Sequence, residues 1–253
     1  MACLWSLVVI DPLFILSTFL CGCISIPLTM FDKTGDTAMR VGRVWARSLL
    51  WIAGVRVTVE GLEKIDLHRN YLFCSNHLSY MDTPVVLANI PVQFRFLAKK
   101  GLFQIPLMGT HLKQAGHIPV PLENPRAAVK TMTTAAAVIQ KRSISMLIFP
   151  EGGRSEDGEL QPFKEGGAFI AIKAGVPLLP IVLIGTREVL AMGSPVFHPF
   201  RRVTLRIGDP ISTEGFTLGD RGQLTEAVRG QIVAMLATPT ETSRKPGFQG
   251  ARA

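Results

Sequence analysis

The sequence predicts an α/β fold with a mostly parallel central sheet flanked by helices, preceded by an N-terminal helical segment. From Gly54 onward, short runs rich in β-branched and aromatic residues alternate with segments of helical period, as in layered α/β domains. Several runs, such as residues 145–149, are apolar on both faces, which is typical of central strands covered by helices on each side. The 253 residues suffice for one such domain with an appendage.

Residues 1–53 are predicted to form membrane-associated helices. Residues 12–31 carry no charge, and a helix of that length can cross the hydrocarbon core. Pro12 and Pro27 bracket a shorter stretch, so crossing and partial insertion both stay open. No Lys or Arg precedes the segment and no small-residue cleavage site follows it, so we expect it to be retained rather than removed as a signal.

A second helix is predicted over residues 36–53, with an apolar stripe on one face and three arginines on another. The stripe consists of Val41, Trp45, Leu49 and Ile52, and the arginines are Arg40, Arg43 and Arg47. Such a helix suits an anionic bilayer surface, and the alternative is a helix packed on the domain with its arginines in water. Because these cations follow the apolar segment, the positive-inside tendency predicts a domain on the cytoplasmic side.

Residues 54–238 are predicted to form the α/β domain, with seven strands and five helices. The strands are expected near residues 55–59, 71–74, 94–97, 118–120, 144–149, 179–184 and 203–207, and the helices near 84–89, 107–113, 125–141, 167–174 and 221–236. Residues 239–253 have no apolar period and are predicted to be a disordered tail.

The formal net charge of +8 favours an anionic partner: nucleic acid, a phospholipid surface or a phosphorylated substrate. The sequence lacks the interleaved aromatic and basic residues that single-stranded nucleic acid needs, so nucleic acid ranks lowest and the membrane highest. The four cysteines match neither a disulfide framework nor a metal site. They predict reducing surroundings and no bound metal.

Candidate chemistry begins with His77 and Asp82, which follow the strand expected at 71–74. An imidazole can accept a proton near neutral pH, and a carboxylate on its other nitrogen fixes the tautomer and stabilises the imidazolium. Five residues separate two side chains by about 140° around an α-helix, so a turn must bring them together. The sequence Asp82-Thr83-Pro84 is typical of a helix start, so the alternative is that Asp82 only caps a helix.

The loop after the strand expected at 144–149 predicts a phosphate site. Gly152 and Gly153 allow close backbone approach, and Arg154 can donate two parallel hydrogen bonds to phosphate oxygens. Ligands collect at the carboxyl ends of parallel strands, so this loop and the His77 turn are expected to face a common crevice. The alternative is an ordinary surface turn.

Four stretches together resemble the blocks of the 1-acyl-sn-glycerol-3-phosphate acyltransferase family, in family order. Asn-His-x4-Asp matches residues 76–82, and a Lys-containing segment ending Ile-Pro-x-x-Gly matches 99–109. Phe-Pro-Glu-Gly-Thr-Arg-Ser matches 149–155, and Val-Pro-x-x-Pro matches 176–180. Gly153 replaces the usual threonine, and the arginine often found shortly after the strand at 118–120 is absent, with Arg126 displaced.

The resemblance implies a membrane-bound enzyme that transfers a fatty acyl group from acyl carrier protein (acyl-ACP) or coenzyme A (acyl-CoA) to the sn-2 hydroxyl of lysophosphatidic acid. The product would be phosphatidic acid. His77 would be the base and Asp82 its orienting partner, while Arg154, with Lys99 or Lys100, would hold the acceptor phosphate.

In the same resemblance, Glu151 would organise the loop or hydrogen-bond the glycerol of the acceptor, and Gly152 would complete the substrate site. No cofactor is implied beyond the thioester co-substrate. Two alternatives stay open: the same chemistry on glycerol 3-phosphate or another lysolipid, and a non-catalytic lipid-binding membrane protein.

Overall fold

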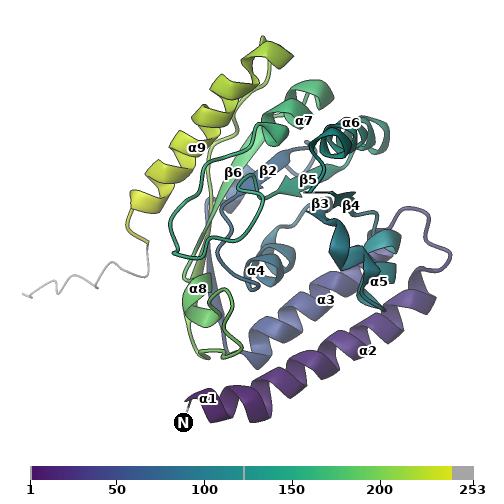
Figure 1. The fold of residues 1–253 in the computed structure, drawn as a ribbon, viewed down its shortest axis with the longest axis vertical. Coiled ribbons are helices and arrows are strands. Elements are labelled where there is room, and N and C mark those ends of the chain that lie inside the picture. Colours follow the sequence, from purple (N-terminus) through teal and green to yellow (C-terminus); the bar gives the residue numbers. More distant parts are fainter. Residues whose placement is uncertain (1, 122, 241–253) are drawn as a thin grey trace, which may run out of the picture.

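The computed structural model of the chain describes residues 2–121 and 123–240. Its centre is a seven-stranded sheet with the order β1-β7-β6-β2-β5-β3-β4 (Figure 1). The strands are β1 Arg56–Glu60, β2 Leu72–Ser75, β3 Phe94–Lys99, β4 Ile118–Val120, β5 Ser145–Ile148, β6 Leu178–Ile184 and β7 Arg202–Ile207. Among the pairs of strands in the described residues only β6–β7 is antiparallel, so the predicted mostly parallel sheet is confirmed. Most of the predicted tail, from residue 241, lies outside the described residues.

Helices cover both faces of the sheet. The α-helices are α1 Ala2–Trp5, α2 Asp11–Thr29, α3 Asp36–Ile52, α4 Asp82–Asn89, α5 Met108–Gln114, α6 Pro125–Arg142, α7 Gly166–Ala174, α8 Thr186–Val189 and α9 Arg221–Ala237. A π-helical turn, η1 (Ser6–Ile10), joins α1 to α2, and the 3₁₀ turns are η2 Leu62–Lys64, η3 Lys100–Gln104 and η4 Leu218–Asp220.

Side chains of β2 alternate between the two helical layers, as the period of a strand requires. Tyr71 and Phe73 belong to the core formed with α3 and α4, whereas Leu72 and Cys74 belong to the core formed with α6, α7 and α9. Figure 1 shows these two groups of helices on opposite sides of the sheet. Strands buried on both faces are mostly apolar, which explains why the sequence predicted them.

Helix α3 lies inside the molecule, between α2 and α4, rather than on an open lipid surface. Ala38, Met39 and Ala46 are fully buried. Arg43, expected on the lipid-facing side, instead donates to the carbonyl oxygens of Pro91 and Val92. The alternative of a helix packed on the domain therefore describes α3 better. A helical period predicts that one face is buried, but it does not predict whether protein or lipid covers that face.

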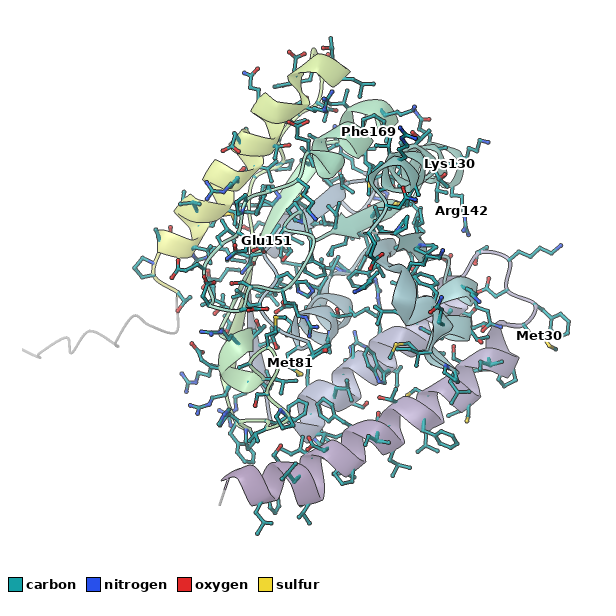
Figure 2. All side chains as sticks on the ribbon, in the orientation of Figure 1. Met30, Met81, Lys130, Arg142, Glu151 and Phe169 are labelled. Carbon is teal, nitrogen blue, oxygen red and sulfur yellow. The ribbon has the colours of Figure 1, made fainter. Side chains whose placement is uncertain are left out.

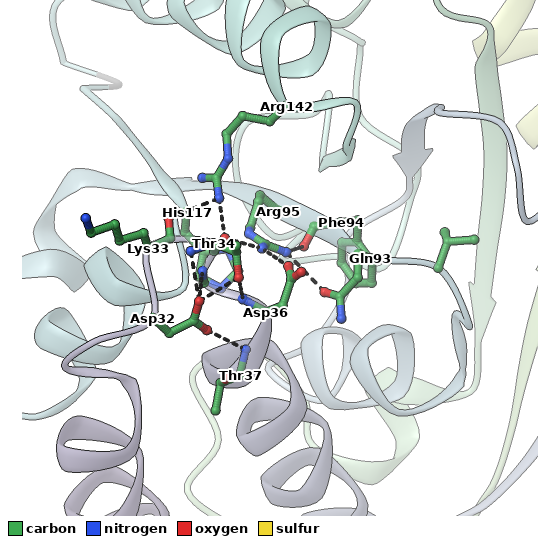
Figure 3. A network of polar contacts seen from close by, with 12 residues as sticks. Asp32, Lys33, Thr34, Asp36, Thr37, Gln93, Phe94, Arg95, His117 and Arg142 are labelled. Carbon is green, nitrogen blue, oxygen red and sulfur yellow. Dashed lines mark hydrogen bonds and ion pairs between the residues drawn. The ribbon is translucent and has the colours of Figure 1, made fainter.

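The linker between α2 and α3 is tied to the sheet by a buried arginine (Figure 3). Arg95 of β3 is fully buried, and its Nη2 donates to the Thr34 carbonyl at 2.9 Å and pairs with Asp36 at 2.7 Å. Arg142, at the end of α6, donates to the same Thr34 carbonyl. A buried guanidinium needs such acceptors, so these contacts fix the N-terminal helices to the domain.

Candidate active site

The turn that follows β2 is anchored by Asn76. Its side-chain amide donates to the Leu183 carbonyl of β6 at 3.0 Å and accepts from the Leu183 N–H at 2.8 Å. Ser79, two residues after His77, donates its hydroxyl hydrogen to the Leu190 carbonyl at 2.6 Å. These buried polar side chains are satisfied by backbone groups of the neighbouring strand and loop, so the turn is held in one conformation.

Within this turn the structure brings His77 and Asp82 together. His77 Nδ1 lies 2.7 Å from Asp82 Oδ2, and the same oxygen accepts from the N–H groups of Leu78 at 2.7 Å and Ser79 at 2.8 Å. A carboxylate only accepts hydrogen bonds, so Nδ1 carries the proton and Nε2 keeps a lone pair. The imidazole is 18% exposed and the carboxylate is fully buried. The pair can therefore act as a base with an orienting acid.

The expectation that Asp82 caps the following helix is wrong. Helix α4 begins at Asp82 itself, and Met81 occupies the cap position without a side-chain hydrogen bond. The carboxylate instead points back into the turn, where it accepts hydrogen bonds from the N–H groups of Leu78 and Ser79 and from the imidazole N–H. All of the assigned hydrogen bonds of Asp82 thus serve the turn.

The loop that follows β5 closes over the His77 turn because β5 is the direct neighbour of β2. Glu151 Oε1 accepts from the His77 N–H at 2.6 Å, and Oε2 accepts from the Gln161 N–H at 2.9 Å. The Ser155 N–H donates in turn to the His77 carbonyl at 2.9 Å. Glu151 therefore makes the contacts of a loop organiser, one of the two roles the sequence left open.

Burial of Glu151 raises the pKa of its carboxyl, although the hydrogen bonds from Gln161 and His77 oppose the shift. Both backbone donors favour the carboxylate form, which has two accepting oxygens. Gly152 next to it adopts a φ of 78°, a conformation that favours glycine, and a Cβ there would collide with the Lys164 ammonium. The loop thus depends on glycine at this position.

Two aromatic contacts that the sequence did not indicate orient the polar groups. The His77 ring stacks on Phe149, with centroids 3.9 Å apart and planes 14° apart. The Arg154 guanidinium lies over the Tyr80 ring, 3.4 Å from its centroid. Phe149 and Tyr80 belong to the matched blocks, but only the fold shows which side chains they contact. Arg154 is therefore beside the turn that carries His77.

Lys99 and Lys100 lie at the carboxyl end of β3, the other neighbour of β5. Lys99 Nζ is 3.6 Å from Glu123, and both side chains are more than half exposed. In the described part of the chain, no polar contact joins either lysine to Arg154 or His77. The two lysines thus lie at the same end of the sheet as His77 and Arg154, without a polar contact to them among the described residues.

An apolar cavity of about 430 Å³ lies between the N-terminal helices and α5. Its walls include Phe14, Phe19, Met39, Trp45 and Leu107, together with Leu87 of α4. Helix α4 begins at Asp82, so the cavity and the His77 turn share this helix. The cavity can accommodate part of a hydrocarbon chain.

Among families of known proteins, residues 56–184 match the acyltransferase family model. The chain belongs to the acyltransferase family. The matched region includes β1 to β6 and all of the His77, Lys99 and Arg154 segments described above. This family assignment confirms the predicted resemblance.

Two proteins similar to this chain are named 1-acyl-sn-glycerol-3-phosphate acyltransferase. The chain is 32% identical over 177 residues to the 1-acyl-sn-glycerol-3-phosphate acyltransferase of Limnanthes douglasii, a match that covers 70% of this chain and 62% of that protein. It thus spans less than two thirds of the length of that relative. The enzyme of the same name from Borreliella burgdorferi is 31% identical over 190 residues, with 75% of each chain covered.

The fold is similar to the crystal structure of the 1-acyl-sn-glycerophosphate (LPA) acyltransferase PlsC from Thermotoga maritima. The TM-score is 0.78 at 25% identity, and the superposition covers 95% of this chain and 100% of that one. The coverage includes most of the N-terminal helices as well as the sheet. The similarity thus supports the architecture of both parts of the chain.

Proposed function

We propose that this acyltransferase is membrane-bound and transfers a fatty acyl group from acyl-ACP or acyl-CoA to the sn-2 hydroxyl of lysophosphatidic acid, giving phosphatidic acid. The observation that carries the proposal is the His77–Asp82 pair, 2.7 Å apart, beside a guanidinium at Arg154. The relatives named for this reaction support the same acceptor.

His77 Nε2 removes the proton from the acceptor hydroxyl as the oxygen attacks the thioester carbonyl. A carbon–oxygen bond forms, the carbon–sulfur bond of the tetrahedral intermediate breaks, and the proton passes from the imidazole to the departing thiolate. Asp82 stabilises the imidazolium in between, because its buried carboxylate lies against Nδ1. The acceptor supplies its own oxygen, so no serine or cysteine nucleophile is needed.

Arg154, with Lys99 or Lys100, holds the acceptor phosphate. Arg154 Nη1 is buried and has no hydrogen-bond acceptor among the described residues, so an anion would satisfy it. The Lys99–Glu123 pair is long and exposed, which makes it weak and easily exchanged for a phosphate. Glu151 and Gly152 shape the loop that presents Arg154.

Helix α2 supplies the membrane contact. Residues 6–29 form a helix that contains an 18-residue stretch of mean hydropathy 2.3, and 6% of that stretch is buried. Exposed apolar residues of this region include Ile15, Phe19, Ile24 and Phe31. Acceptor and product both carry long chains that stay in the bilayer, so the site must be held at its surface. The exposed cations Arg40 and Arg47 favour the cytoplasmic side.

An assay of the purified full chain tests the reaction. Lysophosphatidic acid, glycerol 3-phosphate and a neutral lysolipid are offered with palmitoyl-ACP and palmitoyl-CoA, and phosphatidic acid is measured. We expect turnover with lysophosphatidic acid and its loss in His77→Ala. If only another acceptor is acylated, that acceptor is the substrate. If the thioester is not cleaved with any acceptor, the chain is a lipid-binding protein.

Membrane binding is tested with Leu20→Glu combined with Ile24→Glu, two exposed positions of α2 outside the lining of the apolar cavity. We expect the variant to lose sedimentation with vesicles that contain anionic phospholipid. The matched control replaces exposed apolar residues elsewhere, Leu67→Glu with Val233→Glu, and should sediment like the wild type. Equal sedimentation of both variants would place the membrane contact outside α2.

A further inference from the structure

The positive charge of this chain is concentrated in one segment. Residues 91–150 contain eight of the 27 lysines and arginines but one of the 19 acidic residues, and so account for +7 of the net charge of +8. This segment forms β3, η3, α5, β4, α6 and β5. Arg95 is its one fully buried cation, and the other seven are exposed. The remainder of the chain is nearly neutral, so the excess positive charge lies in these elements.

Helix α6 carries a row of these cations on its outer face. Arg126, Lys130 and Lys141 lie within about 60° of one another around the helix and extend over about 22 Å. The buried residues of α6 are Ala135, Ala136 and Ile139, which lie on the opposite face. Among the described residues, no carboxylate lies within ion-pair distance of any of the three cations. The row is therefore free to meet an anionic partner.

The row begins near the carboxyl ends of the strands, the same end of the sheet that carries His77 and Asp82. Helix α6 starts after the carboxyl end of β4, and it packs on the beginning of α7, where a Cβ on Gly166 would lie 3.4 Å from Met132 Sδ. Two residues earlier, the Lys164 N–H donates to Pro150 in the loop that precedes Glu151. The amino-terminal half of α6 thus flanks the loop that covers His77.

We propose that this α6 row is the docking surface for an acidic acyl carrier protein that delivers the thioester. The inference rests on the proposed function, because the carrier must present an acyl donor to His77. The row is too long and open for the compact phosphates of coenzyme A, whereas it matches a helix of an acidic protein. Val129, 59% exposed, lies beside Arg126 and gives the surface an apolar contact of the kind that protein interfaces use.

The bilayer is the other anionic surface, and the arrangement of the helices disfavours it. In Figure 1, α6 and α2 lie on opposite sides of α5, β3 and the edge strand β4. Figure 2 shows Lys130 on the side of the molecule away from α2. With the apolar face of α2 in the membrane, α6 lies on the aqueous side, where a soluble carrier approaches.

The test compares two donors with the same acyl chain, palmitoyl-ACP and palmitoyl-CoA, in the full chain bound to vesicles. Arg126→Glu with Lys130→Glu reverses the beginning of the row. We expect the KM for palmitoyl-ACP to rise about tenfold and to lose its dependence on salt, with the kcat and the KM for palmitoyl-CoA within about twofold. The control, Arg56→Glu with Arg69→Glu, makes the same charge change at exposed positions elsewhere.

Each result decides between the possibilities. A KM for palmitoyl-ACP that matches the control, or an equal change for both donors, overturns the docking surface. Loss of vesicle sedimentation in the α6 variant would assign the row to anionic lipid and also overturn it. Wild-type turnover with palmitoyl-CoA but not palmitoyl-ACP refutes the inference and leaves the proposed function intact. Turnover with neither donor refutes the proposed function itself.

Discussion

Replacement of Asp82 by Asn isolates the electrostatic part of the proposed mechanism. The variant keeps the size of the side chain and an oxygen that can accept from Leu78 and Ser79, but it removes the negative charge beside Nδ1. With charge centres about 4 Å apart, a unit charge contributes about 4 kcal/mol at an effective dielectric constant of 20. That energy corresponds to a decrease in kcat of about a thousandfold. The assay is phosphatidic acid formation at saturating donor and acceptor.

Two controls make this prediction refutable. Asp82 is fully buried, so circular dichroism and thermal unfolding must show that the variant is folded before its kcat is interpreted. His77→Ala and the double variant then test whether the pair acts as a unit. If it does, Asp82→Asn adds almost nothing to the loss caused by His77→Ala. A folded Asp82→Asn enzyme within tenfold of the wild-type kcat would refute the electrostatic role.

Three further predictions concern Arg154, Tyr80 and His117. Arg154→Ala should raise the KM for lysophosphatidic acid roughly 10- to 150-fold, the equivalent of about 1.5–3 kcal/mol for charged hydrogen bonds, and an effect on kcat alone would contradict a phosphate role. Tyr80→Leu should raise the same KM, and Tyr80→Phe should not, because only an aromatic ring holds the guanidinium. Burial, with smaller contributions from His111 and Arg95, lowers the pKa of His117 to about 3. Between pH 6.5 and 3 the unfolded chain therefore binds a proton that the folded chain does not bind. As the pH is lowered through that window, the free energy of unfolding should decrease by up to about 1.4 kcal/mol per pH unit. Denaturation of His117→Gln should lack this slope.

The sheet was predictable because its strands are buried on both faces. All seven predicted strands are present, with ends that differ by one or two residues, as for β5, which was expected at 144–149 and is Ser145–Ile148. The short helix α8, Thr186–Val189, was not predicted, since four residues show no period. The antiparallel direction of β7 was also beyond the sequence, because hydrophobic pattern carries no information about strand direction.

The site was predictable only in part, for a related reason. Spacing and residue type identified His77 and Asp82 as candidates. Their contact, however, depends on a turn that Asn76 anchors to a residue of β6 more than 100 positions later in the chain. The Phe149 stack and the Tyr80 contact with Arg154 arise because β5 lies beside β2. Such contacts follow from strand order, which local sequence does not contain.

The N-terminal segment differs from an isolated membrane-spanning helix because its polar groups bond to the domain. A helix that crosses a bilayer alone can satisfy its serine and threonine hydroxyls only within the helix, as Thr18 does by donating to the Phe14 carbonyl at 2.7 Å. In α2 these groups face the protein: Ser25 bonds His111 at 2.7 Å, Thr29 donates to Gln114 at 2.7 Å, and Thr18 accepts from Trp45 at 3.0 Å.

The opposite side of α2 is apolar and exposed, while the protein-facing side carries apolar residues such as Phe14 as well as the hydroxyl groups. This exposed side can contact hydrocarbon whether α2 crosses the bilayer or inserts part way, so both arrangements considered from the sequence fit it. Because Ala38, Met39 and Ala46 of α3 are core residues, removal of residues 1–53 would unfold the domain as well as detach it. Charged substitutions on the exposed side of α2 are therefore the informative test of anchoring, since they change the lipid contact and leave the core intact.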